Sequence, residues 1–311
     1  MNLQQIRLRD AEDISEFLLD ATGMIPGYTQ FSAGNADLEY DVVDLEGVSL
    51  LWARGRAHCR WQDQMSDDGR VHFGFALEAE RGALSMGHDL SPSEAMLFLP
   101  GQDMDYVFLG PVLTLEIAVS SDIVEALGWS FTGSPLARLP EPVLRHLAQV
   151  CKDAARVVAG RNYNAPPAHL TELRLRVLDA LEHALAPWLP HNNSSAALVT
   201  EIPRSHRVLR DVDRYMKGGQ GGVFGIETLC SELGVGRRTL FYALRQSLGL
   251  TPRRYFEVLR LNELRCKLKA ASADTSSVTQ LATDLGFGDL GRMAGKYRAQ
   301  FGEYPSATLR S

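Results

Sequence analysis

Apolar residues recur with two different periods along the chain, and the change of period divides it. Between about residues 28 and 120 they alternate with polar or small residues, as in Val71, Phe73, Phe75 and Leu77. Residues 48–52 and 113–119 alternate in the same way, and Gly, Asp and Pro separate the runs. A period of two is typical of strands. These residues predict an antiparallel β-barrel or β-sandwich, preceded by a short amphipathic helix in residues 1–27.

From about residue 141 to 187 the apolar period becomes helical. One predicted helix ends at Gly160 and a second ends before Pro187. Their apolar stripes leave two alternatives of equal weight: the helices cover the β domain, or they pair with a second copy of the chain. Residues 188–204 are polar and bounded by prolines, which predicts a linker. A further helix is expected from about residue 205 to 217.

The C-terminal part contains one unit twice. Leu-Cys-Ser-Glu-Leu-Gly-Val at 229–235 returns as Leu-Ala-Thr-Asp-Leu-Gly-Phe at 281–287. The small residue of each copy, Cys230 or Ala282, lets two short helices approach closely. Gly234 and Gly286 tolerate the positive φ of a tight turn. Two copies with matched flanks predict two helix-turn-helix motifs, at 226–248 and 278–301.

A single helix is predicted to join the two motifs. It begins with Thr251 as N-cap and Pro252 at the first helical position, and it continues to about Ala270. A rigid helix of this length holds the second helices of the motifs apart. Two adjacent major grooves on one face of double-stranded DNA, about 34 Å apart, match that arrangement.

The second helix of each motif is predicted to enter a groove. In the first copy this helix runs from about Arg237 to Leu248, with Leu240 and Leu244 facing inward. Arg238 has the reach to read guanine, whereas Arg237 and Arg245 suit phosphates. Phe241 is apolar where exposure is expected, so either it packs on a thymine methyl or the helix phase is wrong. The candidate DNA contacts are Arg237, Arg238, Phe241, Tyr242, Arg245, Arg292, Lys296 and Arg298.

In the second copy, glycines at 291 and 295 provide no base-reading side chain. This copy is therefore expected to bind DNA phosphates and to contact fewer bases than the first copy.

The distribution of charge agrees with contact to DNA at one end of the chain. The 311 residues have a formal net charge of -6. Residues 200–311 nevertheless hold 18 Lys and Arg against 11 Asp and Glu, while residues 1–199 hold 14 against 27. A basic C-terminal third on an acidic remainder indicates that this third meets a polyanion.

Two helix-turn-helices joined by one helix, closing with Phe301-Gly302-Glu303-Tyr304-Pro305, resemble the DNA-binding domain of AraC/XylS-family transcription regulators. Residues 1–140 resemble more loosely the cupin-like β-barrel sensor domains of that family. The resemblance implies an α+β multidomain protein with a sensor at 1–140, a helical segment at 141–187, a linker at 188–204 and a DNA-binding domain at 205–311. It further implies a small-molecule effector, a homodimer, transcription activation through RNA polymerase, and no enzyme activity.

Other chemistry is less specific in this sequence. Five aromatic residues, Trp52, Trp61, Phe73, Phe75 and Phe98, either line a ligand pocket or form ordinary core. Glu116 either meets a cationic ligand or faces water. The histidines lack the spacing of a cupin metal site, so neither a metal nor a cofactor is expected.

The cysteines lack paired spacing and no apolar run reaches membrane-spanning length, so a cytoplasmic protein without a membrane is expected. Two alternatives stay open: a regulator controlled by a protein partner, and a β-barrel enzyme with structural C-terminal helices.

Overall fold

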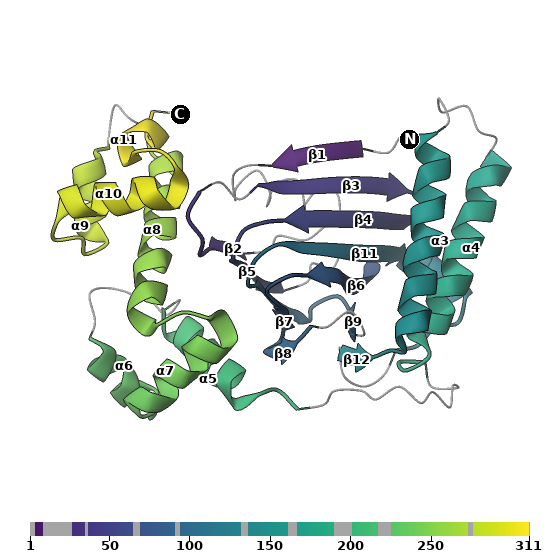
Figure 1. The fold of residues 1–311 in the computed structure, drawn as a ribbon, viewed down its shortest axis with the longest axis horizontal. Helices are drawn as coiled ribbons and strands as arrows, with labels where there is room; N and C mark the ends of the chain where they lie inside the picture. The colour runs from purple at the N-terminus through teal and green to yellow at the C-terminus, as the bar shows by residue number, and fades with distance from the viewer. Residues whose placement is uncertain are drawn as a thin grey trace.

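The computed structural model describes residues 4–8, 27–34, 37–64, 69–90, 94–131, 136–160, 167–189, 201–216, 225–272 and 276–310. Figure 1 shows the strands between two groups of helices: α3 and α4 at one end, and the C-terminal helices at the other. Most of the predicted linker lies outside the described residues.

The strands form two antiparallel sheets. The seven-stranded sheet has the order β1-β3-β4-β11-β6-β9-β12, and the five-stranded sheet has the order β2-β5-β10-β7-β8. The antiparallel β architecture is therefore as predicted, but the strands make two sheets and do not close into one barrel. The strands are β1 Gln4–Leu8, β2 Gly27–Gln30, β3 Leu38–Asp44, β4 Val48–Gly55, β5 Cys59–Gln64, β6 Arg70–Ala79, β7 Ala83–Ser85, β8 His88–Asp89, β9 Glu94–Phe98, β10 Asp103–Phe108, β11 Val112–Ser120 and β12 Leu136–Arg138.

Alternation along the central strands gives the seven-stranded sheet two different faces. On β11, Leu115 and Ile117 belong to the core on the outer face, and Glu116 between them points toward the five-stranded sheet. Trp61 and Tyr106 of the five-stranded sheet border the same space between the sheets. The sheets therefore enclose an inner layer, and the outer face of the seven-stranded sheet is left for helices to cover.

Helices α3 (Glu141–Ala159) and α4 (Pro167–Leu185) cover that outer face. Leu147 and Cys151 of α3 and Val177 and Leu181 of α4 are buried in one core with the apolar residues of β4, β6 and β11. The apolar stripes are thus used within the chain, which fulfils the covering alternative. Pairing with a second copy through this segment would have to use its mainly polar outer faces.

Three elements differ from the predictions. Residues 4–8 form β1, which pairs with β3, so the predicted helix is wrong there because its residues extend a sheet; residues 9–26 lie outside the described part. Helix α2 (Ser121–Ala126) and strand β12 (Leu136–Arg138) were not predicted. Both are too short to show a period in the sequence.

The C-terminal helices are α5 (Arg204–Tyr215), α6 (Ile226–Glu232), α7 (Arg237–Leu248), α8 (Pro252–Ala270), α9 (Val278–Asp284), α10 (Leu290–Phe301) and α11 (Pro305–Thr308). In Figure 1, α8 runs between the group of α6 and α7 and the group of α9, α10 and α11. Tyr255 and Val258 of α8 belong to the first group's core, and Leu264 and Leu268 belong to the second. One rigid helix therefore sets the position of both motifs.

Candidate nucleic-acid interface

The two helix-turn-helix motifs have the same local geometry. Gly234 has φ 62° and Gly286 has φ 76°, as the sequence predicts for the turn. The residue after each glycine donates its backbone N–H to the small residue of the first helix: Val235 to Cys230 O and Phe287 to Ala282 O, both at 3.0 Å. The sequence repeat is thus a structural repeat.

Helix α7 buries one face and exposes the predicted one. Leu240, Leu244 and Leu248 are fully buried, while Phe241 and Tyr242 are 37% and 64% exposed. The predicted helix phase is therefore right, and of the two interpretations of Phe241 the thymine contact remains a prediction.

The basic side chains of α7 differ in how they are held. Arg237 bonds Glu227 at 3.0 Å and lies over the Phe241 ring at 5.9 Å. Arg238 and Arg245 are exposed and form no hydrogen bond or ion pair within the part of the chain that the structure describes. These two side chains are therefore able to reach outward without losing a partner.

Within the described residues, helix α10 has fewer basic side chains without an internal partner than α7 has. Met293 and Tyr297 face inward as predicted. Lys296 forms an ion pair with Glu257 of α8, and Arg298 bonds the Tyr304 hydroxyl at 2.9 Å. The side chain of Arg292 is exposed and has no such partner among the described residues. Among the described residues, the second motif thus has one predicted basic DNA contact without an internal side-chain partner, Arg292. The first motif has two, Arg238 and Arg245.

A buried ion cluster joins the five-stranded sheet to the C-terminal helices. Arg60 of β5 bonds Asp105 of β10 through two nitrogens, at 2.8 and 2.5 Å, and it bonds Asp213 of α5 at 2.8 Å. Asp213 also accepts from Gln62 at 3.0 Å and from the Tyr255 hydroxyl at 2.7 Å. Burial alone would lower the pKa of Arg60, but the two carboxylates raise it well above its usual value. The positive charge of Arg60 is therefore paired with the negative charges of both Asp105 and Asp213.

A second junction holds the end of α10. Gln300 is 1% exposed, and its side chain donates to the carbonyls of Gln30 and Ser32 at 3.0 and 2.7 Å. Gly34 N donates back to Gln300 O at 2.9 Å, and Arg254 bonds Gln300 Oε1 at 2.6 Å. Both motifs are thus attached to the β half of the chain, and none of these junction residues was predicted. Their partners lie far away in sequence, so no local pattern marks them.

The contact between α5 and the β half is expected to weaken in acid. His206 of α5 is 2% exposed beside Asp105 and Gly87. Burial lowers its pKa below the usual value. The unfolded chain therefore binds a proton first as pH falls below about 6.5. The contribution of neutral His206 to the free energy of unfolding is therefore fully present above that pH. It is lost as pH falls through the lowered pKa of the folded state. Urea unfolding measured at descending pH tests this.

The control for that titration is His206→Gln, which removes the group. The pH slope below about 6.5 should become shallower in this variant. Burial also lowers the pKa of His58, which contacts Leu248, so part of the slope should remain. An unchanged slope in the variant would contradict the assignment to His206.

The structure places the predicted ligand residues at several sites. Phe73 and Phe75 belong to the core under α3 and α4, and Phe98 belongs to a core cluster between the sheets. Trp52 lines a surface groove, whereas Glu116 lines the cavity between the sheets. Alternation explains the division, because neighbouring strand residues point to opposite faces.

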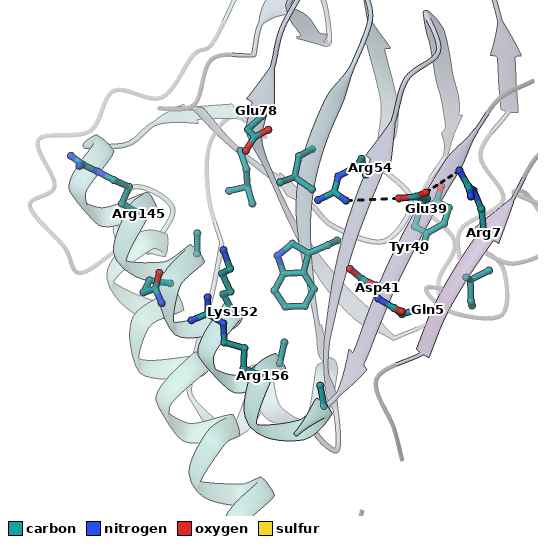
Figure 2. Close-up of a pocket in the computed structure, with 18 residues that line it drawn as sticks. Gln5, Arg7, Glu39, Tyr40, Asp41, Arg54, Glu78, Arg145, Lys152 and Arg156 are labelled. Atoms are coloured by element: carbon teal, nitrogen blue, oxygen red, sulfur yellow. Dashed lines mark hydrogen bonds and ion pairs between the residues drawn. The ribbon is translucent and has the colours of Figure 1, made fainter. Parts of the chain in front are cut away.

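The groove lies between the outer face of the seven-stranded sheet and α3, as Figure 2 shows. Its volume is about 780 Å³. Arg54 and Arg7 form ion pairs with Glu39 at 3.8 and 3.2 Å on one side, and Lys152 projects from α3 on the other. Both signs of charge border the groove, with five Lys or Arg side chains against three Asp or Glu.

The cavity between the sheets is smaller, about 70 Å³, and mostly aromatic. Besides Glu116 it is lined by Tyr40, Trp61 and Tyr106. Trp61 was among the aromatic residues predicted for a pocket, whereas Tyr40 and Tyr106 were not. The alternation of residues 103–108 was the signal that could have found Tyr106.

Within the described residues, no group of three His, Cys, Asp or Glu side chains is arranged to hold a metal ion. In the described part of the chain the cysteines form no disulfide bond, and Cys266 is the exposed one. A membrane-spanning helix was likewise not found in the described part of the chain.

Comparison with known proteins decides the family. Residues 229–311 match the helix-turn-helix domain family. The XylDLEGF operon transcriptional activator of Pseudomonas putida is 34% identical over 108 residues, which are 35% of this chain and 32% of that activator. XylDLEGF operon transcriptional activator 2 of the same organism is 32% identical over 125 residues, 40% of this chain and 77% of the relative. The chain belongs to the AraC/XylS family of transcription regulators.

Membership in this family confirms the predicted resemblance and rules out the alternative of a β-barrel enzyme. The matched part of this AraC/XylS-family chain spans about a third of the length of the first relative. Among solved structures, the AraC-like transcriptional activator CuxR is similar to this chain with 12% sequence identity and a TM-score of 0.43. The match covers 90% of this chain and 100% of the CuxR chain.

Proposed function

We propose that this chain is a sequence-specific DNA-binding regulator that activates transcription and responds to a small-molecule effector bound in its β half. The observation that carries the DNA-binding part is the repeated motif geometry on one helix. Helix α8 has 19 residues and is therefore about 28 Å long. It separates α7 and α10 on a scale that suits adjacent major grooves, about 34 Å apart.

The first motif supplies the base-reading contacts in this proposal. Arg238 at the start of α7 reads a guanine edge, Tyr242 contacts a base edge or a phosphate, and Phe241 packs on a thymine methyl. Arg237 and Arg245 position the helix on phosphates. The second motif holds phosphates through Arg292, with Lys296 and Arg298 available only after exchange of their present partners.

Salt-dependent binding of the full-length chain to DNA from upstream of its own gene and its neighbours tests the proposal. We expect affinity for one fragment to exceed that for the others, and a steep decrease of affinity with salt. Equal, weak binding to all fragments at low salt would contradict sequence-specific regulation. The preferred fragment would also locate the operator.

Replacing Arg245 with alanine should weaken binding to specific and nonspecific DNA alike. A phosphate contact contributes counterion release and no base preference, so the slope of log affinity against log salt should decrease in magnitude by about one. Titrations of both DNAs at several salt concentrations measure this. A loss confined to the preferred fragment would instead assign Arg245 to base reading.

Two further partners belong to the proposal. The relatives are named as transcriptional activators, which supports action on RNA polymerase. A homodimer would present four motifs to DNA and lengthen the operator. Light scattering of the full-length chain at increasing concentration tests dimer formation, and a mass that stays at one chain would contradict it.

A further inference from the structure

The cavity between the sheets has an aromatic lining. Four aromatic side chains border it: Tyr40, Trp61, Tyr106 and Phe108. The faces of aromatic rings carry partial negative charge and attract cations placed over them. The lining therefore suits a ligand that combines apolar surface with positive charge.

One carboxylate faces these rings. Among the described residues that border the cavity, Glu116 is the sole Asp, Glu, Lys, Arg or His. Its Oε1 lies 2.8 Å from Nδ1 of His72, which is its one hydrogen bond in the described part of the chain. Oε2 is thus able to accept from a ligand. The Glu116 side chain is 23% exposed, so a ligand entering from solvent can reach it.

The charge of Glu116 acts across the cavity. Burial raises the pKa of Tyr40 and Tyr106 well above the usual value, and the Glu116 carboxylate raises both further. The two phenols therefore stay neutral. With no Lys or Arg among the described lining residues, the cavity is short of positive charge.

We propose that this cavity binds a small organic cation, a protonated primary amine whose ammonium group pairs with Oε2 of Glu116. The carbon chain of the amine lies against the aromatic rings. Met96 and Met104 also line the cavity, and their flexible side chains adjust to ligands of different size. This inference deepens the proposed function, on which its regulatory meaning rests, by giving the effector a chemical class.

The strands that line the cavity are those that hold the C-terminal helices. Trp61 of β5 and Tyr106 of β10 are register partners whose side chains face the cavity. Arg60 and Asp105, next to them on the same strands, point the other way into the buried ion cluster. A ligand that shifts Trp61 or Tyr106 also moves the attachment of α5 and α8. Occupancy of the cavity thereby changes how the motifs are held.

Calorimetric titration of the full-length chain with matched ligands tests the cation site directly, without DNA. The probes are propylammonium, 1-propanol and propionate. We expect propylammonium to bind at least about tenfold more tightly than the other two, because a charge-assisted bond to a carboxylate requires the positive charge. Equal or tighter binding of the alcohol or the carboxylate, or the absence of saturable ammonium binding, would overturn the proposal.

Glu116→Gln is expected to lower ammonium affinity by about tenfold or more and to remove the preference for the ammonium over the alcohol. The matched control is Glu78→Gln, on the neighbouring strand but lining the outer groove, which should leave affinity unchanged. Unchanged affinity in Glu116→Gln would overturn the site. If that variant does not fold, Glu116→Asp, which retains the charge, should retain the preference, and its loss there would contradict the assignment.

The regulatory step is measured separately. If the site couples to DNA binding, propylammonium changes DNA affinity by some factor, and DNA changes propylammonium affinity by the same factor. Ammonium binding that depends on Glu116 without any change in DNA affinity supports the cation site and removes its role as effector site. Ammonium binding in a chain that does not bind DNA supports the site and contradicts the proposed function alone.

Discussion

Replacing Arg60 with alanine is expected to lower the free energy of unfolding by about 3–5 kcal/mol, because one partner of a buried charge cluster is removed. Arg60 is 2% exposed, and its loss would leave Asp105 and Asp213 close together without a cation. Their negative charges would repel in a medium that screens poorly. The affected contact joins β5 and β10 to α5, so the attachment of the C-terminal helices should be the first part to fail.

Urea unfolding of the full-length chain, followed by circular dichroism and by tryptophan fluorescence, measures the effect. Arg54→Ala is the matched control, since the Arg54–Glu39 pair is 58% and 40% exposed at 3.8 Å. An exposed pair of this kind contributes about 0–1 kcal/mol. A loss in Arg60→Ala no larger than that of the control would show that the cluster does not stabilise the junction.

Replacing Arg238 with alanine is expected to weaken binding to the preferred DNA by about 1–3 kcal/mol, which corresponds to about 5- to 140-fold in affinity. Arg238 is exposed at the start of α7 and its side chain forms no hydrogen bond or ion pair with the described residues, so its guanidinium has no internal partner to give up. Two parallel bonds to a guanine edge would be lost. Preference at one base position should relax, which a series of single-base variants of the operator measures.

Arg238→Lys is the control that separates charge from geometry. Lysine retains the positive charge but not the planar pair of donors. Nonspecific affinity should therefore stay close to that of the unmodified chain, while the base preference at that position decreases. If Arg238→Ala instead weakens preferred and nonspecific DNA by the same factor, Arg238 contacts phosphate and does not read bases.

The C-terminal part was predictable because its determinants are local. A positive φ at Gly234 and Gly286, small residues at the helix crossing, and Thr251 with Pro252 at the start of α8 each act within a few residues along the chain. The helices and the phase of α7 follow from these positions. The second motif was predicted with the same success, although the pairing of Lys296 with Glu257 joins helices far apart in sequence and could not be anticipated.

By itself the sequence determined the elements whose period or turn chemistry is local: the alternation of β4, β6 and β11, the stripes of α3 and α4, and the two motifs. Only the tertiary structure decided that the strands form two sheets, that Glu116 faces a cavity with Trp61 and Tyr106, and that Arg60 joins the halves of the chain. The physical reason is sequence distance. A buried charge is stable only beside its partners, and Asp213 lies more than a hundred residues from Arg60. No local pattern records that pairing.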